Sequence, residues 1–245
     1  MANGKIHSIE TMGAVDGPGI RTVVFMQGCK LRCVYCHNPD TWALNSSEIT
    51  MSPRELLSLI VRYRPYYGTL GGVTFSGGEP LLQADFLIEM LSLCKQENIH
   101  TCIDTAGFGI GKYEEILKYT DLVLLDIKHY DDDAFKEITG QLPTETVRFI
   151  NTLKKVQTPV WLRHVVVPTL TDNIEHLDKI EKYYVNSLNV QRIEFLPYHT
   201  LGVSKYAKMG LAYPLKGVPP LSADSLKERN DRLITIKNNN EKFNI

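Results

Sequence analysis

Short apolar runs alternate with amphipathic stretches along most of the chain. The apolar runs predict strands at residues 20–27, 72–76, 100–104, 122–127, 160–167 and 190–196. Helical spacing predicts helices at residues 52–63, 84–97, 113–119, 131–139, 145–156, 173–185 and 222–237. The first helix carries a complete start signal, with Ser52 as N-cap, Pro53 at the first position and Glu55 three residues after the cap.

Strands that alternate with helices indicate parallel βαβ units joined by right-handed crossovers. A near-continuous apolar strand such as LVLLDI, at residues 122–127, is typical of a sheet buried on both faces. The pattern therefore favours one α/β domain over residues 1–245, either an open, partial (βα)6 barrel of the TIM type or a doubly wound sheet. In both folds the functional residues lie at the carboxyl ends of the strands.

Polar residues gather just past the predicted strands. The first strand leads into a cysteine-rich segment, and later strands lead into Gly77-Gly78-Glu79-Pro80, Asp104-Thr105, Asp126 with Lys128, Arg163-His164, and Pro197-Tyr198-His199. Because the carboxyl ends of parallel strands share one edge of a sheet, these residues are expected to form a single site.

Composition places the chain among soluble globular proteins, since 43% of its 245 residues are apolar. It has 27 Lys and Arg against 28 Asp and Glu, and the net charge of −1 argues against general binding to nucleic acids or anionic membranes. The polar start lacks a secretory signal, and the apolar runs are too short to span a bilayer. We therefore expect a cytoplasmic protein with reduced thiols, and the odd number of cysteines, 5, excludes complete internal disulfide pairing.

Three of the cysteines stand close together as Cys29-x3-Cys33-x2-Cys36, followed by His37. One interpretation is a tetrahedral zinc site with His37 as the fourth ligand, although four ligands within nine residues would be unusually compressed. The other is a [4Fe–4S] cluster held by three thiolates, which leaves one iron open. Cys94 on an apolar helix face and Cys102 inside a strand are expected to be small core residues.

These motifs resemble those of the radical S-adenosylmethionine (radical SAM) enzymes, and among them the family of activating enzymes of glycyl-radical enzymes. The resemblance extends over almost the whole chain. It rests on VDGPGIR at residues 15–21, QGCKLRCVYCHNPDTW at 27–42, VTFSGGEP at 73–80, HTCIDTAGF at 100–108, DLVLLDIK at 121–128, LRHVVVP at 162–168 and LPYHTLG at 196–202. Some relatives carry a ferredoxin-like insert that needs about eight additional Cys. Only Cys94 and Cys102 are spare, so the chain resembles the shorter, pyruvate formate-lyase type.

The resemblance implies a partial barrel of the radical SAM type in which SAM binds the open iron of the cluster. One electron from the reduced cluster would cleave SAM to methionine and a 5′-deoxyadenosyl radical. Cys29, Cys33 and Cys36 would be the cluster ligands and catalytic residues. The implied SAM contacts are Tyr35, Cys36, His37, Gly77, Gly78, Asp126, Ile127, Lys128 and His199. A monovalent cation is implied beside the SAM carboxylate, at Asp104, Thr105, Asp126 and the backbone of Leu124.

The implied substrate is a backbone glycine of pyruvate formate-lyase, which loses a hydrogen atom and becomes a glycyl radical. The segment Asp16, Gly17, Pro18, Gly19 and Arg21 is expected to form a tight loop at the barrel mouth and to receive the partner's glycine-bearing segment. A flavodoxin or ferredoxin is the implied electron donor, and the chain is expected to be a monomer.

Three alternative functions remain open at the level of the sequence. The chain could activate another glycyl-radical enzyme. It could be a radical SAM enzyme acting on a small acidic molecule, for which Arg163 and His164 would supply cationic groups. The non-enzymatic alternative is a zinc-stabilised binding module.

Overall fold

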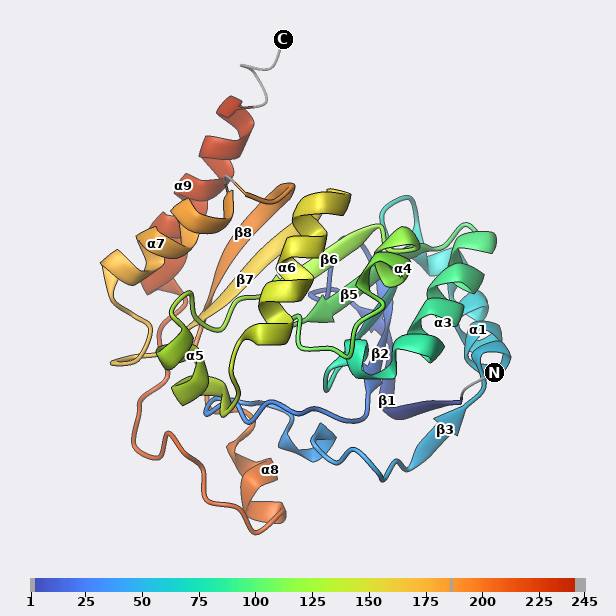
Figure 1. Ribbon diagram of the computed structural model, residues 1–245, viewed down its shortest axis with the longest axis horizontal. Helices are drawn as coiled ribbons and strands as arrows, with labels where there is room; N and C mark the ends of the chain where they lie inside the picture. Colours follow the sequence, from blue (N-terminus) through green and yellow to red (C-terminus); the bar gives the residue numbers. More distant parts are fainter. Residues whose placement is uncertain (1–2, 186, 241–245) are drawn as a thin grey trace.

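The predicted alternation of strands and helices builds one eight-stranded sheet in the computed structural model, which describes residues 3–185 and 187–240 (Figure 1). The strands are β1 Gly4–Gly13, β2 Arg21–Met26, β3 Ile49–Met51, β4 Gly72–Gly77, β5 His100–Thr105, β6 Leu122–Asp126, β7 Val160–Val166 and β8 Val190–Pro197. All six predicted strands are present. The strand β1 and the short edge strand β3 were not predicted.

The helices are α1 Pro53–Arg62, α2 Arg64–Tyr67, α3 Ala84–Gln96, α4 Tyr113–Lys118, α5 Asp132–Thr139, α6 Thr144–Val156, α7 Ile174–Val185, α8 Val203–Lys208 and α9 Asp224–Asn240. Every predicted helix is confirmed, whereas α2 and α8 were not predicted. Helix α1 starts with a complete capping box, in which the Ser52 hydroxyl accepts from the Glu55 amide and the Glu55 carboxylate accepts from the Ser52 amide.

The order of the strands in the sheet decides between the two predicted folds. The order is β3-β1-β2-β4-β5-β6-β7-β8, and the neighbours from β2 to β8 are all parallel. Each new strand is therefore added on the same edge, with no point at which the direction of winding reverses. The doubly wound alternative is wrong, because that fold requires such a reversal. The partial (βα)6 barrel is confirmed, with β1 and β3 added antiparallel at its first edge.

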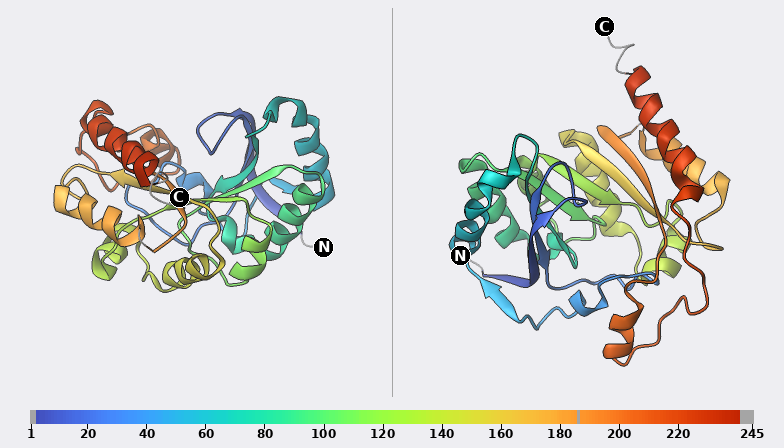
Figure 2. Two further views of the ribbon diagram at one scale, coloured as in Figure 1. Left: turned by 90° about the horizontal axis from the view of Figure 1, so that it is seen from above. Right: turned by 180° about the vertical axis from the view of Figure 1, so that it is seen from behind.

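The sheet curves, and most of its helices lie on the outer face (Figure 2). Leu56 and Ile60 of α1, and Phe86, Leu87 and Met90 of α3, are buried in the main hydrophobic core. Burial of such side chains contributes roughly 2 kcal/mol each and holds the helices against the strands. Among the described helices, none is long and apolar enough to cross a membrane.

Candidate active site

The loop that follows β2, residues 27–42, contains the three clustered cysteines and is called the cysteine loop below. It crosses the carboxyl ends of the parallel strands. Its backbone is anchored to the end of α5, since Arg32 N–H donates to Thr139 O (2.7 Å) and Val34 N–H donates to Ile138 O (2.9 Å). The cysteines therefore lie at the carboxyl edge of the barrel, where the sequence predicted the site.

One cavity brings together the residues that the sequence placed after different strands. Its walls include Cys29, Cys33, Tyr35, Cys36, His37, Gly77, Gly78, Asp104, Thr105, Asp126 and Lys128. Cys94 and Cys102 do not line it and are completely buried in separate apolar clusters. The expectation that these two cysteines are core residues is therefore confirmed.

The two interpretations of the cysteine motif, zinc and a [4Fe–4S] cluster, ask for different arrangements of the ligands. Within residues 3–185 and 187–240, no three His, Cys, Asp or Glu side chains are placed to hold one metal ion together. A [4Fe–4S] cluster suits a wider arrangement, because each thiolate binds a different iron. Burial raises the pKa of Cys33 to about 11 and also raises the pKa of Cys29 and Cys36. The free thiols therefore stay protonated, and deprotonation accompanies metal binding.

Gly77 and Gly78, at the end of β4, lie against the backbone at the end of β2 and the start of the cysteine loop. Gly77 has a φ of 97°, and a Cβ there would lie 2.5 Å from Met26 N. A Cβ on Gly78 would lie 2.3 Å from Gly28 O. Both positions require glycine because two backbones pass in contact, so the pair shapes the floor of the cavity.

Glu79 is a buried carboxylate that the sequence analysis did not single out beyond its motif. Its Oε1 accepts from the Thr105 hydroxyl (2.5 Å) and from Leu81 N–H (3.2 Å), while Oε2 accepts from Ala106 N–H (3.0 Å). Burial raises the pKa of Glu79 to about 7, although these hydrogen bonds oppose the shift. Glu79 thus ties the turn after β4 to the turn after β5.

Asp126 and Lys128 point to the same side, as predicted, and form an ion pair. Lys128 Nζ lies 2.6 Å from Asp126 Oδ2, and the ammonium is also 5.4 Å from the centre of the Tyr35 ring. Burial alone would lower the pKa of Lys128, but the Asp126 carboxylate outweighs it and holds that pKa well above its usual range. The ammonium is therefore charged in the cavity wall.

A second ion pair occupies the carboxylate of Asp104. Asp104 Oδ1 accepts from Arg163 (2.8 Å), and Oδ2 accepts from the Ser76 hydroxyl (2.7 Å). The Thr105 hydroxyl donates to Glu79. Two of the side chains expected to bind a monovalent cation are thus engaged in contacts within the protein.

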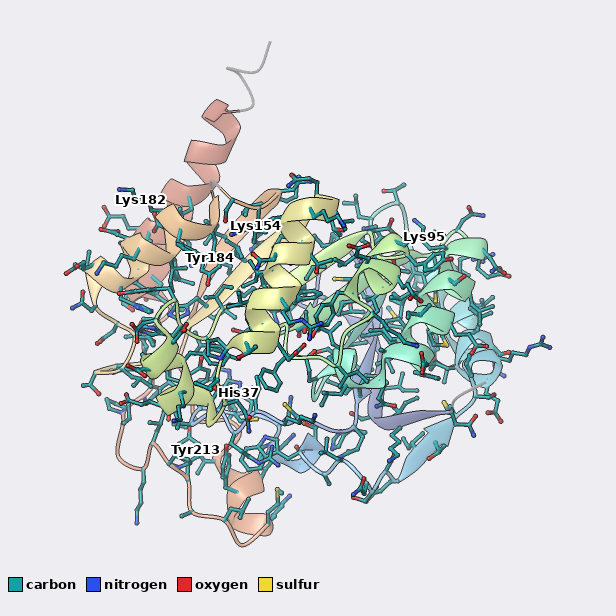
Figure 3. The ribbon with its side chains drawn as sticks, in the orientation of Figure 1. His37, Lys95, Lys154, Lys182, Tyr184 and Tyr213 are labelled. Carbon is teal, nitrogen blue, oxygen red and sulfur yellow. The ribbon has the colours of Figure 1, made fainter. Side chains whose placement is uncertain are left out.

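His37 and His199 connect the cysteine loop to the end of the last strand. Their rings stack with 3.8 Å between centroids. Lys205 on α8 adds a polar contact to the same loop, since its Nζ lies 2.8 Å from Asn38 Oδ1 and 3.0 Å from Asp40 Oδ2. Figure 3 labels His37 above Tyr213 and α8 in this view. The segment after β8 therefore covers the cysteine loop.

Unpaired polar atoms cluster at this cavity. Among the described side chains, five buried nitrogen or oxygen atoms lack a hydrogen-bond partner, and four of them belong to Tyr35, Asp126, Arg163 and His199. Tyr35 and Asp126 line the cavity, and Arg163 and His199 are bonded to or stacked on residues that do. Buried polar groups are rarely left without partners, so this concentration fits a site that binds a polar ligand.

The loop between β1 and β2, residues 14–20, does not lie where the sequence analysis expected. Arg21 pairs with Gly72 at the amino end of β4, whereas the cysteine loop leaves from the carboxyl end of β2 (Figure 2). The loop is therefore at the opposite end of the strands from the barrel mouth. The Asp16 carboxyl is half-buried. Burial, and then the negative charge of Asp104, raise its pKa.

Arg21 also differs from its expected role of receiving a partner segment. Its side chain is completely buried and donates to Pro18 O (2.8 Å), Thr74 Oγ1 (2.6 Å) and Val73 O (2.8 Å). The Thr74 hydroxyl in turn donates to Asp16 O (2.7 Å). Arg21 holds the loop from inside and does not face outward.

Comparisons with known proteins show the family to which the chain belongs. Residues 23–180 match the profile of the radical SAM superfamily. The pyruvate formate-lyase-activating enzyme of Clostridium pasteurianum is 54% identical over 229 residues, which cover 93% of this chain and 96% of the relative. The enzyme of the same name from Staphylococcus epidermidis is 45% identical over 237 residues, with 93% and 94% covered. The chain therefore belongs to the radical SAM superfamily and, within it, to the family of pyruvate formate-lyase-activating enzymes.

Solved structures share the fold. A domain of the pyruvate-formate lyase-activating enzyme from Bacteroides vulgatus matches with a TM-score of 0.52 at 23% identity, covering 69% of this chain and 95% of that one. Streptococcus suis SuiB bound to its precursor peptide SuiA matches with a TM-score of 0.62 at 16% identity, covering 89% of this chain and 46% of that one. At these identities the likeness supports the partial barrel alone.

Proposed function

We propose that this chain activates pyruvate formate-lyase by abstracting a hydrogen atom from a backbone glycine of that enzyme, at the expense of SAM. The observation that carries the proposal is the convergence of Cys29, Cys33 and Cys36 with the Asp126–Lys128 pair in one cavity. This convergence occurs in a chain 54% identical to a pyruvate formate-lyase-activating enzyme over nearly its whole length.

The donor set of the cavity fits a [4Fe–4S] cluster. Cys29, Cys33 and Cys36 would each hold one iron, and the apolar side chains of Leu31, Ala106 and Phe108 pack around the cysteines. When bound, the cluster supplies the electron that cleaves SAM and an open iron for the amino acid part of SAM. The surrounding apolar contacts would limit access of water to the thiolates.

The remaining cavity residues fit the charged and polar parts of SAM. We infer that the backbone of Gly77 and Gly78 borders the amino group of SAM, and that Lys128 attracts its carboxylate. The unpaired Asp126 Oδ1 offers an acceptor beside that ammonium. Tyr35, Cys36 and His37 on the cysteine loop, with Ile127 and His199, would border the nucleoside.

A monovalent cation beside the SAM carboxylate belongs to the same proposal. Its ligands would be Asp104, Thr105, Asp126 and the backbone oxygen of Leu124. Asp126 Oδ1 is unpaired and so is ready to bind it. Asp104 already accepts from Arg163 and Ser76, so the cation would use the remaining lone pairs of its carboxylate.

The open barrel supplies a route for a protein substrate. The sheet has free edges at β3 and β8, so the barrel does not close on itself. We infer that the glycine-bearing segment of pyruvate formate-lyase enters through this opening and reaches Asp16, Gly17, Pro18 and Gly19 from the side of the cavity. The loop faces the barrel interior at Asp16, whose backbone oxygen accepts from the Thr74 hydroxyl of β4 (2.7 Å), and this position supports the proposed contact.

The electron would come from a flavodoxin or ferredoxin, and the chain would act as a monomer. The reducing cytoplasm is the compartment that suits the chemistry, because it keeps the three cysteine thiols available for iron.

The proposal is tested by isotope transfer. Pyruvate formate-lyase is prepared with deuterated glycine and incubated anaerobically with the reduced, cluster-loaded enzyme and SAM. Deuterium should appear in 5′-deoxyadenosine, as measured by mass spectrometry. Cys33→Ala should abolish the transfer, while the matched variant Cys94→Ala should retain it. Cleavage of SAM without deuterium transfer would instead support activation of another glycyl-radical enzyme or a small-molecule substrate.

A further inference from the structure

Two buried histidines lie directly behind the segment that carries Asp126 and Lys128. His164 on β7 has 1% of its surface exposed, and His176 on α7 has 7%. His164 Nδ1 lies 2.7 Å from the backbone oxygen of Ile127, and His164 Nε2 lies 3.1 Å from His176 Nε2. A chain of hydrogen bonds therefore runs from α7 through β7 to the residue between Asp126 and Lys128.

The direction of each hydrogen bond follows from the chemistry of the groups. A carbonyl oxygen only accepts, so His164 Nδ1 must carry a hydrogen and donate to Ile127 O. In a neutral imidazole the other nitrogen is then an acceptor, so His176 Nε2 must donate to His164 Nε2. The hydrogen on His176 Nε2 therefore fixes the tautomer of His164. In that tautomer His164 Nδ1 carries the hydrogen that it donates to Ile127 O.

The surroundings keep both rings neutral. Burial lowers the pKa of His164 to about 4 and that of His176 to about 3. The charged groups that act on them are Asp126 and Lys128 on the side of His164, and Lys179 on the side of His176. His129 stacks on His176 with 4.4 Å between ring centroids, and Tyr130 lies 5.3 Å from the same ring.

Ile127 is the point at which the sheet stops supporting this segment. The last registered pair between β6 and β7 is Asp126 with Arg163, and Ile127 N–H still donates to Arg163 O (2.8 Å). The next acceptor, Ile127 O, is bonded by the side chain of His164. His164 therefore holds the peptide unit between Ile127 and Lys128, next to Asp126.

We propose that His164 and His176 are positioning residues of the SAM site, which set the Asp126–Lys128 pair through the carbonyl of Ile127. This inference rests on the proposed function of that pair. Neither histidine lines the cavity itself, so both act on the site through the peptide that they hold.

Paired substitutions separate this role from simple packing. His164→Asn keeps a donor at the position of Nδ1, whereas His164→Leu removes it. His176→Gln keeps a donor at the position of Nε2, whereas His176→Leu removes it. The dissociation constant for SAM is measured on anaerobically reconstituted enzymes with equal iron content. Each Leu variant should bind SAM about tenfold more weakly, and the Asn and Gln variants should stay within about threefold of the wild type.

Wild-type affinity in both Leu variants would overturn the positioning role. A wild-type enzyme that fails to bind SAM at its cluster would instead refute the proposed function, so the two failures are distinguishable. If a Leu variant does not fold, nitrogen-15 NMR of the histidines in the full wild-type chain tests the same proposal through their tautomers. His164 should be protonated at Nδ1 and His176 at Nε2, and the opposite tautomer of His164 would contradict the inference.

Discussion

The ring of His37 stacks on the ring of His199 at 3.8 Å, although 162 residues separate them in the sequence. His37 belongs to the cysteine loop and His199 follows the last strand of the open barrel. Burial, and next the neighbouring His199, lower the pKa of His37 to about 4, so this ring is uncharged at neutral pH. The stack joins the first and last parts of the proposed SAM site.

Replacement of His199 by Ala should weaken SAM binding about tenfold, because one wall of the site is lost and His37 is freed to move. The measurement is the dissociation constant for SAM on the reconstituted enzyme. His7→Ala is the matched control, because His7 lies outside the cavity beside Asp40. Equal affinities for the wild type and His199→Ala would show that the stack is not part of the site.

Replacement of Arg21 by Met should lower the free energy of unfolding by about 3 kcal/mol, because several buried acceptors lose their donor at once. Arg21→Lys should recover only part of this loss, since one ammonium cannot reproduce the fork of the guanidinium. Denaturant titration measures both changes. The exposed Arg54→Met on α1 is the control and should stay close to the wild type.

The same Arg21→Met variant tests whether the loop at residues 14–20 is needed for SAM cleavage or only for radical formation on the protein substrate. Cleavage of SAM without the protein substrate should persist, while formation of the glycyl radical should fall, because Arg21 supports residues 14–20 and not the cysteine loop. Equal loss of both activities would place Arg21 in general stability alone.

Glu79 gives the protein a pH-dependent stability. Its pKa is about 7 in the folded chain against 4.5 as the reference, chiefly because of burial. The folded state therefore binds the proton more tightly, so this contribution is present at low pH and is lost as the pH rises from 4.5 toward 7. The corresponding change in the free energy of unfolding is about 3 kcal/mol.

Glu79→Gln should remove this dependence. The Tm of the metal-free wild type minus that of the variant should decrease across the same pH range, as measured by circular dichroism. Asp85→Asn, at an exposed ion pair on α3, is the control. A constant difference in Tm would mean that Glu79 does not titrate in this window.

The barrel was predictable because its strands are short, apolar and separated by clear helices. Every residue of LVLLDI, at residues 122–127, is buried except Asp126, which is half-buried, so hydrophobicity alone predicted this strand. β1 and β3 were not predicted, because their hydrophobic signal is weak. β1 has Ser8, Glu10 and Thr11 among its apolar positions, and β3 has just Ile49, Thr50 and Met51.

The site was predictable where contiguous motifs carry it and not where distant contacts do. The three cysteines, the glycine pair and the Asp126–Lys128 alternation are local patterns. The burial of Arg21 depends on Thr74 and His100, which lie far along the chain. Charged residues usually face solvent, so nothing in the local sequence indicated that the Arg21 side chain would point inward.

The most direct test is electron paramagnetic resonance of pyruvate formate-lyase after anaerobic incubation with SAM and the reduced, cluster-loaded enzyme. With the wild-type enzyme we predict the doublet of a glycyl radical. The doublet should be absent with Cys29→Ala, Cys33→Ala or Cys36→Ala and present with Cys102→Ala. Cleavage of SAM with no glycyl radical on pyruvate formate-lyase would contradict it.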